Sequence, residues 1–168
     1  MIAPATKLLS DVERVEYVDR SDRVFTSPRR VKFYEMEYAL PLDSLPEALE
    51  RLRKMVPTLT SQVTWPVEVR ASAGDDAHLS TAHGRPTGYL AMHVGKGGET
   101  DEYFRASEEI MMDYGGRPHW GKMHYRDASS LAEAYPRWNA FQAIRADLDP
   151  GGRFTNDYVN RVLGPVVG

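Results

Sequence analysis

VKFYEMEYAL, the stretch from Val31 to Leu40, alternates between two sides of an extended chain, and the rest of the fold is predicted outward from it. Because successive side chains of a strand point to opposite faces, a period of two residues predicts a β-strand. One side is apolar and expected to be buried; it consists of Tyr34, Met36, Tyr38 and Leu40. The other side is expected to face away from the core; it consists of Val31, Phe33, Glu35, Glu37 and Ala39.

A helix is predicted after this strand, from about Leu45 to Met55. Ser44 and Glu47 have the spacing of a capping box, and the proline between them is tolerated in the first turn of a helix. Apolar residues recur at intervals of three and four, which indicates one buried helix face: Leu45, Leu49, Leu52 and Val56. Pro57 ends the helix.

The most regular alternation lies in QVTWPVEVRASAG, residues 62–74, and predicts a second strand. Its apolar face consists of Val63, Trp65, Val67, Val69 and Ala71. Glu68 and Arg70 share the opposite face about 7 Å apart at the backbone, so their side chains can meet. Pro66 cannot donate a ladder hydrogen bond, which indicates an edge position or a bulge. The charged pair is either an exposed ion pair that contributes little to stability or part of a site.

A third strand is predicted over GYLAMHV, residues 88–94, with His93 on the polar side. Its apolar side consists of Leu90, Met92 and Val94. The preceding loop, GDDAHLSTAHGRP, contains acidic and histidine residues that superficially suggest a metal: Asp75, Asp76, His78 and His83. They lack the close pairing of a helical His-x-x-x-His site, so we interpret the loop as a solvated turn and predict no metal site.

GGRPHWGKMHY, residues 115–125, carries the most unusual composition of the chain. It follows a helix that we expect to be capped by Asp101 and to end at the Gly-Gly pair. The buried face of that helix is predicted from Tyr103, Ser107, Ile110, Met111 and Tyr114. Pro118 restricts the residue before it to extended geometry, so His119, Trp120 and Lys122 leave the helix on a defined path and the lysine can be aimed. The alternative is a loop that Trp120 anchors, with a lysine that extends to water.

Mostly helical structure is predicted for the remaining chain. Asp127 caps a short helix through Leu131, Pro136 opens another, and Asn156–Leu163 forms the last. The apolar stripe of the middle helix consists of Trp138, Phe141, Ile144 and Leu148. Because strands and helices do not alternate regularly, we predict an α+β fold with an antiparallel sheet flanked by helices. The chain, residues 1–168, is expected to form a single domain, with Lys7–Ser27 as an arm.

Composition excludes several classes of function. The formal net charge of -3 provides no basic surface for a phosphate backbone, so we expect no nucleic-acid partner. There is no cysteine, which excludes disulfides, thiolate metal sites and cysteine nucleophiles. No apolar run has the length of a spanning helix, so no transmembrane segment is predicted and a cytoplasmic protein is expected. The chain also lacks a glycine-rich phosphate loop and a serine nucleophile elbow.

Several of these stretches together resemble one family over nearly the whole chain. They are VDRSDRVFTSPRRVKFYEMEYALP, VEVR, HWGKMHY and YPRWNAFQAIRADLDPGGRFTNDYVNRVLG. The resemblance is to the C-terminal region of D-arabinono-1,4-lactone oxidases, L-gulonolactone oxidases and alditol oxidases, which are flavoproteins of the vanillyl-alcohol-oxidase type. HWGK followed by the DP-G-F-N-Y ending is specific, whereas E-V-R on a strand is weak alone.

The resemblance implies a fold and a cofactor. In this family the region forms the substrate or cap domain, an antiparallel sheet flanked by helices that covers FAD. The FAD-binding domain precedes it, often with a histidine that holds the flavin covalently, and nothing in this sequence matches that domain. The expected partners are therefore a sugar lactone or polyol substrate and an N-terminal FAD-binding domain. Some relatives associate peripherally with membranes.

The resemblance also implies roles for individual residues. Lys122 and Arg70 match the family's active-site lysine and arginine and are expected to act on substrate, with Arg70 also facing the reduced flavin. Glu68 is expected to orient Arg70 or accept a hydrogen bond from a substrate hydroxyl. His119 is expected at the flavin or as a support for Lys122, and His93 at the substrate. Trp120 is expected to pack.

Two interpretations of the whole chain follow from the missing domain. The favoured one is the substrate-binding part of a longer FAD-dependent oxidase, inactive when isolated. The alternative is a stand-alone, flavin-free module that binds a polyol or a protein partner through the same face. The identity of the sugar, the electron acceptor and the oligomeric state do not follow from the sequence.

Overall fold

The computed structural model describes residues 16–24, 26 and 30–166, and the chain divides into two compact units, Met1–Phe33 and Tyr34–Gly168. In the first unit the described residues include one short, exposed helix, α2 (Ser21–Val24). Much of the arm predicted for Lys7–Ser27, including everything up to residue 15, lies outside the described residues.

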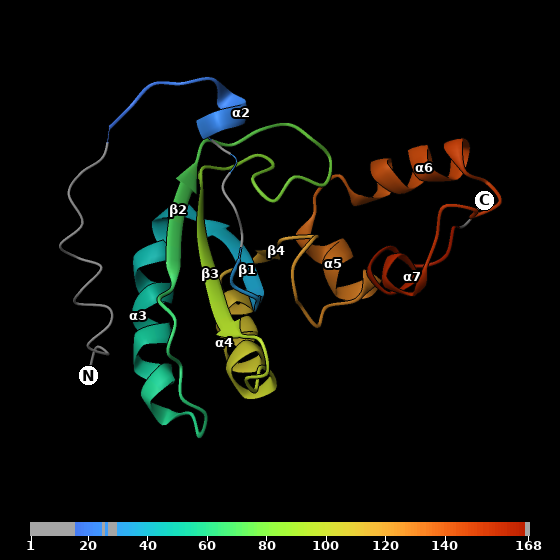
Figure 1. Ribbon diagram of the computed structural model, residues 1–168. Helices are drawn as coiled ribbons and strands as arrows, with labels where there is room; N and C mark the ends of the chain where they lie inside the picture. The colour runs from blue at the N-terminus through green and yellow to red at the C-terminus, as the bar shows by residue number, and fades with distance from the viewer. Residues whose placement is uncertain (1–15, 25, 27–29, 167–168) are drawn as a thin grey trace. The chain divides into compact units, whose positions relative to one another are not determined.

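The second unit contains the sheet and the longer helices (Figure 1). Its elements run in the order β1 (Phe33–Pro41, which begins at the unit boundary), α3 (Leu45–Met55), β2 (Glu68–Ser72), β3 (Thr87–Gly95), α4 (Asp101–Asp113), β4 (Arg117–Pro118), α5 (Ala128–Ala134), α6 (Trp138–Leu148) and α7 (Asp157–Leu163). Two short 3-10 helices flank α3, at Leu42–Ser44 and Val56–Thr58. The α+β class predicted from the order of elements is confirmed.

The strands form one antiparallel sheet in the order β2-β3-β1-β4. β1 is therefore an interior strand, and β2 is an edge strand, as Pro66 indicated. The register places Arg70 opposite Tyr89 and Glu68 opposite Ala91, so these four residues share one face of the sheet. That face, called the open face below, carries the candidate site.

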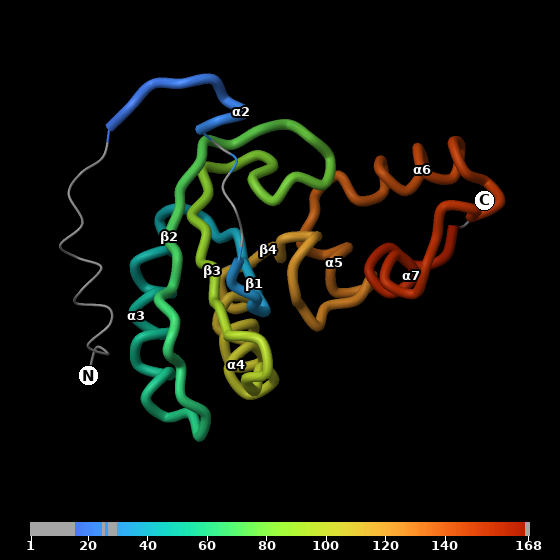
Figure 2. The backbone as a smooth tube through the Cα atoms, in the orientation of Figure 1, coloured from blue at the N-terminus to red at the C-terminus, as the bar shows by residue number. Residues whose placement is uncertain are grey.

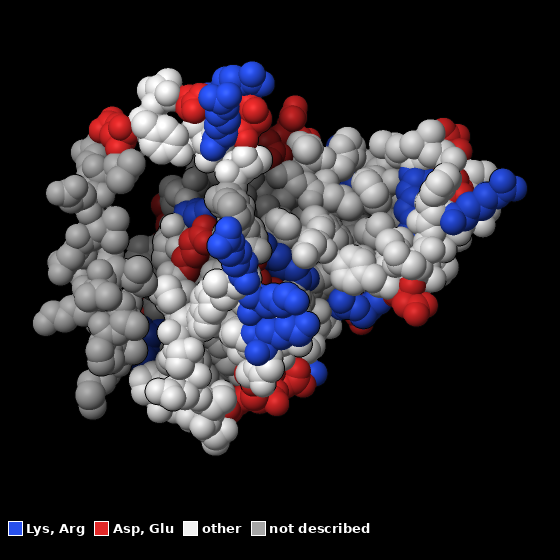
Figure 3. Space-filling view, in the orientation of Figure 1, with Lys and Arg blue, Asp and Glu red and all other residues white. Residues whose placement is uncertain are grey.

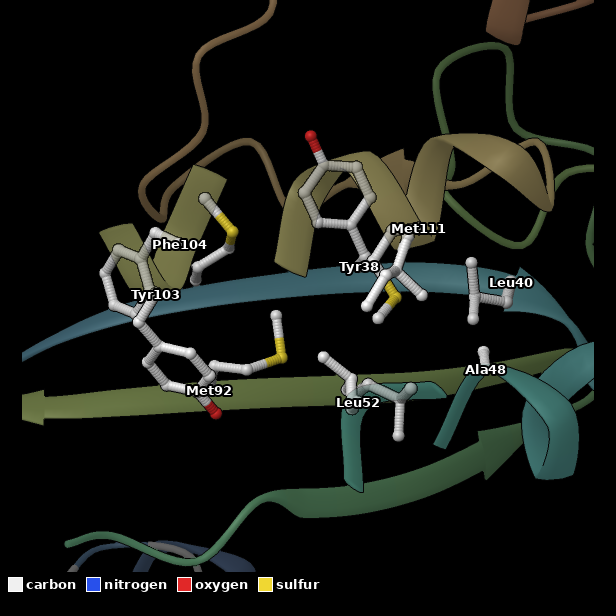
Figure 4. Close-up of a cluster of buried hydrophobic side chains, with 11 residues drawn as sticks. Tyr38, Leu40, Ala48, Leu52, Met92, Tyr103, Phe104 and Met111 are labelled. Atoms are coloured by element: carbon white, nitrogen blue, oxygen red, sulfur yellow. The ribbon is translucent and has the colours of Figure 1, made fainter. Parts of the chain in front are cut away.

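The opposite face of the sheet is covered by α3 and α4. Figure 4 shows side chains of both helices meeting side chains of β1 and β3 in one apolar cluster. The buried members of this cluster are Met36, Tyr38, Leu40, Ala48, Leu52, Leu90, Met92, Tyr103, Phe104, Ile110 and Met111. The predicted strand and helix faces supply most of them, so the pattern of apolar residues located the core correctly.

Glu108 places a carboxylate inside this core. It is 7% exposed, accepts a 2.5 Å hydrogen bond from the Tyr38 hydroxyl and accepts a 2.9 Å bond from the backbone N–H of Tyr125. A buried carboxylate requires such partners, because an unpaired one is costly. Glu108 thereby ties α4 to the chain that follows the candidate site.

The edge strand differs most from its prediction. Residues 62–67 lie outside β2, because Pro66 lacks an N–H and interrupts the ladder. Every residue of β2 is exposed, and Val69 retains 47% of its surface, so the apolar face expected here is buried only in part, where Val63 and Val67 pack against the core before the strand begins. An edge strand has a neighbour on one side only, which leaves more of its side chains in solvent.

The helix ends also differ in detail from the predictions. The predicted capping box of α3 is absent: Ser44 has helical backbone angles because it closes a 3-10 helix, and its side chain caps nothing. The N-cap of α4 is Thr100, one residue before the predicted Asp101. Asp127 does cap α5, and α4 ends before Gly115, whose φ of 63° is the left-handed conformation that a glycine tolerates.

A second apolar cluster joins α5 and α7, which lie side by side in Figures 1 and 2 although α6 separates them in the chain. Its buried members are Leu131, Tyr135, Trp138 and Val162. The apolar stripe predicted along α6 is wrong beyond its first turn, because Ile144 and Leu148 are 49% and 77% exposed. Trp120 packs against this cluster, as predicted, with its ring 5.2 Å from that of Tyr135.

Candidate functional site

The open face of the sheet carries two carboxylates on its interior strand. Glu35 and Glu37 are two residues apart on β1 and point to the same side. This side of β1 faces away from the apolar core, as predicted, but Glu37 is nevertheless buried, with its side chain 0% exposed. An interior strand is flanked on both edges, and a later segment of the chain also covers this position.

That later segment is the turn that carries Lys122. The backbone N–H of His119 donates to the Glu37 carbonyl at 2.9 Å, and that of Met123 donates to the Glu35 carbonyl at 2.9 Å. The two bonds fasten the segment to β1, while the Lys122 N–H closes the turn on the His119 carbonyl at 3.1 Å. Lys122 therefore stands above the two glutamates, and the prediction of a directed path after Pro118 is confirmed.

Lys122 and Arg70 meet on the buried carboxylate of Glu37. The Lys122 ammonium donates to both Glu35 and Glu37, and Nη2 of Arg70 donates to the second oxygen of Glu37. Arg70 lies on β2, so its side chain reaches past β3 to β1. On the strand between them, Tyr89 lies opposite Arg70, and its ring centroid is 5.4 Å from the guanidinium carbon.

Glu68 and His93 extend the group at its two sides. Nε of Arg70 lies 3.4 Å from a Glu68 oxygen, and Nε2 of His93 lies 3.3 Å from a Glu35 oxygen. The six residues are called the charged network below: Glu35, Glu37, Glu68, Arg70, His93 and Lys122. It contains three carboxylates, one ammonium, one guanidinium and one imidazole on the open face.

Exposure divides the charged network into an inner and an outer part. Glu68 and Arg70 retain 54% and 50% of their side-chain surface, Lys122 retains 20%, and Glu37 retains none. Burial alone raises the pKa of Glu37, but the hydrogen bonds and charges of Lys122 and Arg70 outweigh it, so the pKa lies below its ordinary value. Glu37 is therefore an ionised, solvent-inaccessible anion beneath two cations.

His93 borders a cavity at the end of β3. The indole of Trp65 stacks on its ring with centroids 6.1 Å apart and an interplanar angle of 26°. Both side chains line a volume of about 280 Å³, together with residues 61–64, 94–96, 98, 99 and 103. The cavity adjoins the charged network and has an aromatic wall.

His119 lies apart from the charged network, on the exposed surface of the same turn. Its Nδ1 accepts a 3.0 Å hydrogen bond from the Gly121 N–H, so the neutral ring carries its proton on Nε2 and presents a donor there. Trp120 is partly buried against the second apolar cluster, and its Nε1 donates to the Leu79 carbonyl at 2.9 Å. The turn thus has one anchored and one exposed ring.

Of the predicted site residues, the structure brings together Glu68, Arg70, His93 and Lys122. Glu68 and Lys122 are more than fifty positions apart in the sequence. Sequence reasoning assigned no role to Glu35 and Glu37. The available signal was two acidic residues on one side of an otherwise apolar strand. The described residues hold no group of three potential metal ligands among His, Cys, Asp and Glu.

Helix α7 contacts the 119–123 turn through Tyr158. The Tyr158 hydroxyl donates to the Trp120 carbonyl, so the 3.1 Å contact between that hydroxyl and His124 requires an N–H on Nε2 of the histidine. His124 is buried, with 5% of its surface exposed. Burial, followed by the charges of Arg161 and Arg126, lowers its pKa from 6.5 to about 4.

This lowered pKa predicts a pH dependence of stability. Between pH 6.5 and 4 the unfolded chain binds a proton at His124 that the folded chain does not, so stability falls as the pH drops through this window. We expect the Tm of the chain to fall between pH 7.5 and 5, and His124→Gln, which keeps a donor for Tyr158, to flatten that fall. Thermal unfolding at both pH values measures it, and equal slopes for parent and variant would contradict the assignment.

Fold and site together define a class: an α+β domain whose antiparallel sheet presents an arginine, a histidine and carboxylates on its open face, with a lysine held over them by the 119–123 turn. Figure 3 shows acidic and basic side chains interspersed among the described residues of the face in view. None of the described helices is long and apolar enough to cross a membrane.

The sequence matches the D-arabinono-1,4-lactone oxidase family over residues 4–162, and the chain belongs to this family. It is 53% identical over 147 residues to an L-gulono-1,4-lactone dehydrogenase of Mycobacterium tuberculosis, covering 88% of this chain and 34% of that protein. It is 36% identical over 153 residues to the L-gulonolactone oxidase of Bos taurus, covering 88% and 35%. It is 36% identical over 136 residues to an alditol oxidase of Streptomyces sp., covering 77% and 31%. The chain thus spans about a third of the length of these curated relatives.

Proposed function

We propose that this chain is the substrate-binding part of an FAD-dependent oxidoreductase that oxidises a CH–OH group of a sugar lactone or alditol. The observation that carries the proposal is the Lys122 ammonium, held over the open face by two carboxylates and flanked by Arg70. The relatives named above support it, since their names specify lactones and alditols as substrates. The substrate of this chain is proposed to come from the same two classes.

The exposed members of the charged network bind substrate in this proposal. Glu68 accepts hydrogen bonds from hydroxyl groups, and His93 contacts the substrate beside the cavity that Trp65 lines. As the reacting hydroxyl loses its proton, negative charge develops on its oxygen, and Lys122 stabilises that charge. Arg70 adds a second cation at the same place, with half of its side chain accessible.

The residues of the open face also fit an FAD ring. When bound, the flavin supplies the hydride acceptor, and the electrons pass on to oxygen or another acceptor. Arg70 offers a planar cation to the electron-rich reduced ring, and the exposed His119 offers an N–H donor. We propose that an FAD-binding domain holds most of the cofactor and faces this sheet.

Flavin retention tests the proposal that a separate domain holds most of the FAD. We expect this chain, purified alone, to retain no FAD and to oxidise no lactone or alditol, because its donors reach only one side of a flavin. The complete protein that contains this region should purify with the absorbance band of bound flavin. If the chain alone retained measurable flavin, the proposal would have assigned the cofactor site to the wrong domain. A native product that begins at Met1 and carries no flavin would favour the stand-alone binding module.

A further inference from the structure

We propose that Glu37 is a positioning residue of the oxidation reaction, which holds Lys122 and Arg70 in one fixed arrangement; this inference rests on the proposed function. Glu37 cannot contact a substrate, since its side chain is 0% exposed beneath the two cations. Its effect on the reaction must pass through the residues that it binds. It therefore differs in kind from Glu68, which is accessible on the edge strand.

Each carboxylate oxygen of Glu37 binds a different cation. Oε1 accepts from Nη2 of Arg70, and Oε2 accepts from Nζ of Lys122. One planar carboxylate thus sets the separation and relative orientation of two cations that come from β2 and from the 119–123 turn. Since the two elements are about fifty residues apart in sequence, this shared anion on β1 couples their side chains directly.

The remaining donor of Lys122 is directed by the same contacts. An ammonium has three N–H donors, and two of them are taken by Glu35 and Glu37. The third N–H therefore has its direction set by the other two, on a side chain that is still 20% exposed. A donor aligned before the reaction costs no reorganisation when charge develops on the substrate.

The backbone reinforces this arrangement. The same residue that supplies the carboxylate, Glu37, also accepts the His119 N–H through its carbonyl at 2.9 Å. The main chain of the turn therefore stays attached to β1 when the Glu37 side chain is changed. Glu37→Gln keeps the shape and a hydrogen-bond acceptor and removes the charge, so it tests the carboxylate and leaves the backbone anchors in place.

A double-mutant cycle of thermal stability on this chain tests the coupling between Glu37 and Lys122 without an activity measurement. We expect Glu37→Gln to lower the Tm. In the Lys122→Met background the same substitution should lower the Tm by less than half as much, because the ion pair between Glu37 and Lys122 has already been removed. Glu108→Gln is the matched control: it neutralises another buried carboxylate, bound by Tyr38 and Tyr125, and its effect should be the same in both backgrounds.

A second cycle, on the complete flavoprotein, measures the anaerobic rate of flavin reduction. We expect Glu37→Gln to slow reduction about 10- to 100-fold with substrate affinity changed less than about threefold, since small displacements of catalytic groups cost this much. In the Lys122→Met background the same substitution should cost less than about threefold. Glu108→Gln should change the rate by the same factor in both backgrounds.

The outcomes separate the two proposals. Equal costs of Glu37→Gln with and without Lys122, in either cycle, would overturn the positioning role and leave the proposed function intact. A parent flavoprotein that no lactone or alditol reduces would overturn the proposed function and the positioning role with it. In that case the stability cycle would still report whether Glu37 couples to Lys122 in the folded chain.

Discussion

Lys122→Met is expected to slow flavin reduction in the complete protein roughly a hundredfold to a thousandfold, on the order of 3 to 4 kcal/mol, because it removes one preorganised donor. Methionine keeps most of the packing of the lysine stem and deletes the charge. Because the stabilised charge appears only as the hydroxyl proton leaves, the loss should fall on the reduction rate far more than on substrate binding. Stopped-flow mixing with substrate under anaerobic conditions measures both.

The control for this substitution is Lys54→Met on α3, a lysine that is 70% exposed on the helix-covered side of the sheet. It should leave the reduction rate unchanged. A Lys122→Met enzyme that folds and reduces its flavin within about threefold of the parent would show that Lys122 only forms structural ion pairs with Glu35 and Glu37 and takes no part in the reaction.

Arg70→Lys is expected to be the second most costly change, with kcat/KM lowered about tenfold to a hundredfold. The guanidinium meets Glu37 with one nitrogen and Glu68 with another, and it lies 5.4 Å from the Tyr89 ring centroid. An ammonium on a shorter stem cannot reproduce this planar set of contacts. Steady-state kinetics measure the loss, which should appear in both kcat and KM, because Arg70 is proposed to contact substrate and to share Glu37 with Lys122.

Arg53→Lys provides the matched control, since Arg53 also makes two hydrogen bonds to a carboxylate, that of Glu50, but on the exposed surface of α3. Its kcat/KM should equal that of the parent. If Arg70→Lys behaved like Arg53→Lys, the Arg70 interaction would be an exposed ion pair, which contributes little.

Local pattern was enough to place the outer part of the charged network. The alternation around Glu68 and Arg70 depends only on strand geometry, and the path to Lys122 depends on the Gly-Gly stop and Pro118. Both predictions are confirmed because they involve residues within a few positions of each other. Which of these residues meet across the sheet did not follow from periodicity, and the family resemblance supplied that expectation.

The inner part of the charged network could not be predicted in this way. The burial of Glu37 results from the 119–123 turn, which joins β1 through hydrogen bonds from residues more than eighty positions away. The alternation of side chains along a strand assigns Glu35 and Glu37 to one face of the sheet. It does not predict which part of the chain covers that face. The same limit explains Val69, which has an apolar pattern but lies on an edge strand where little covers it.

The most direct test of the account is anaerobic reduction of the flavin in the complete, unsubstituted protein. It would be mixed separately with L-gulono-1,4-lactone, D-arabinono-1,4-lactone and an open-chain alditol, and the flavin absorbance would be followed with time. We predict that at least one of the three reduces the flavin fully, with a rate that saturates as its concentration rises. A flavin that stays oxidised with all three would contradict the claim that this face holds a lactone or alditol for oxidation.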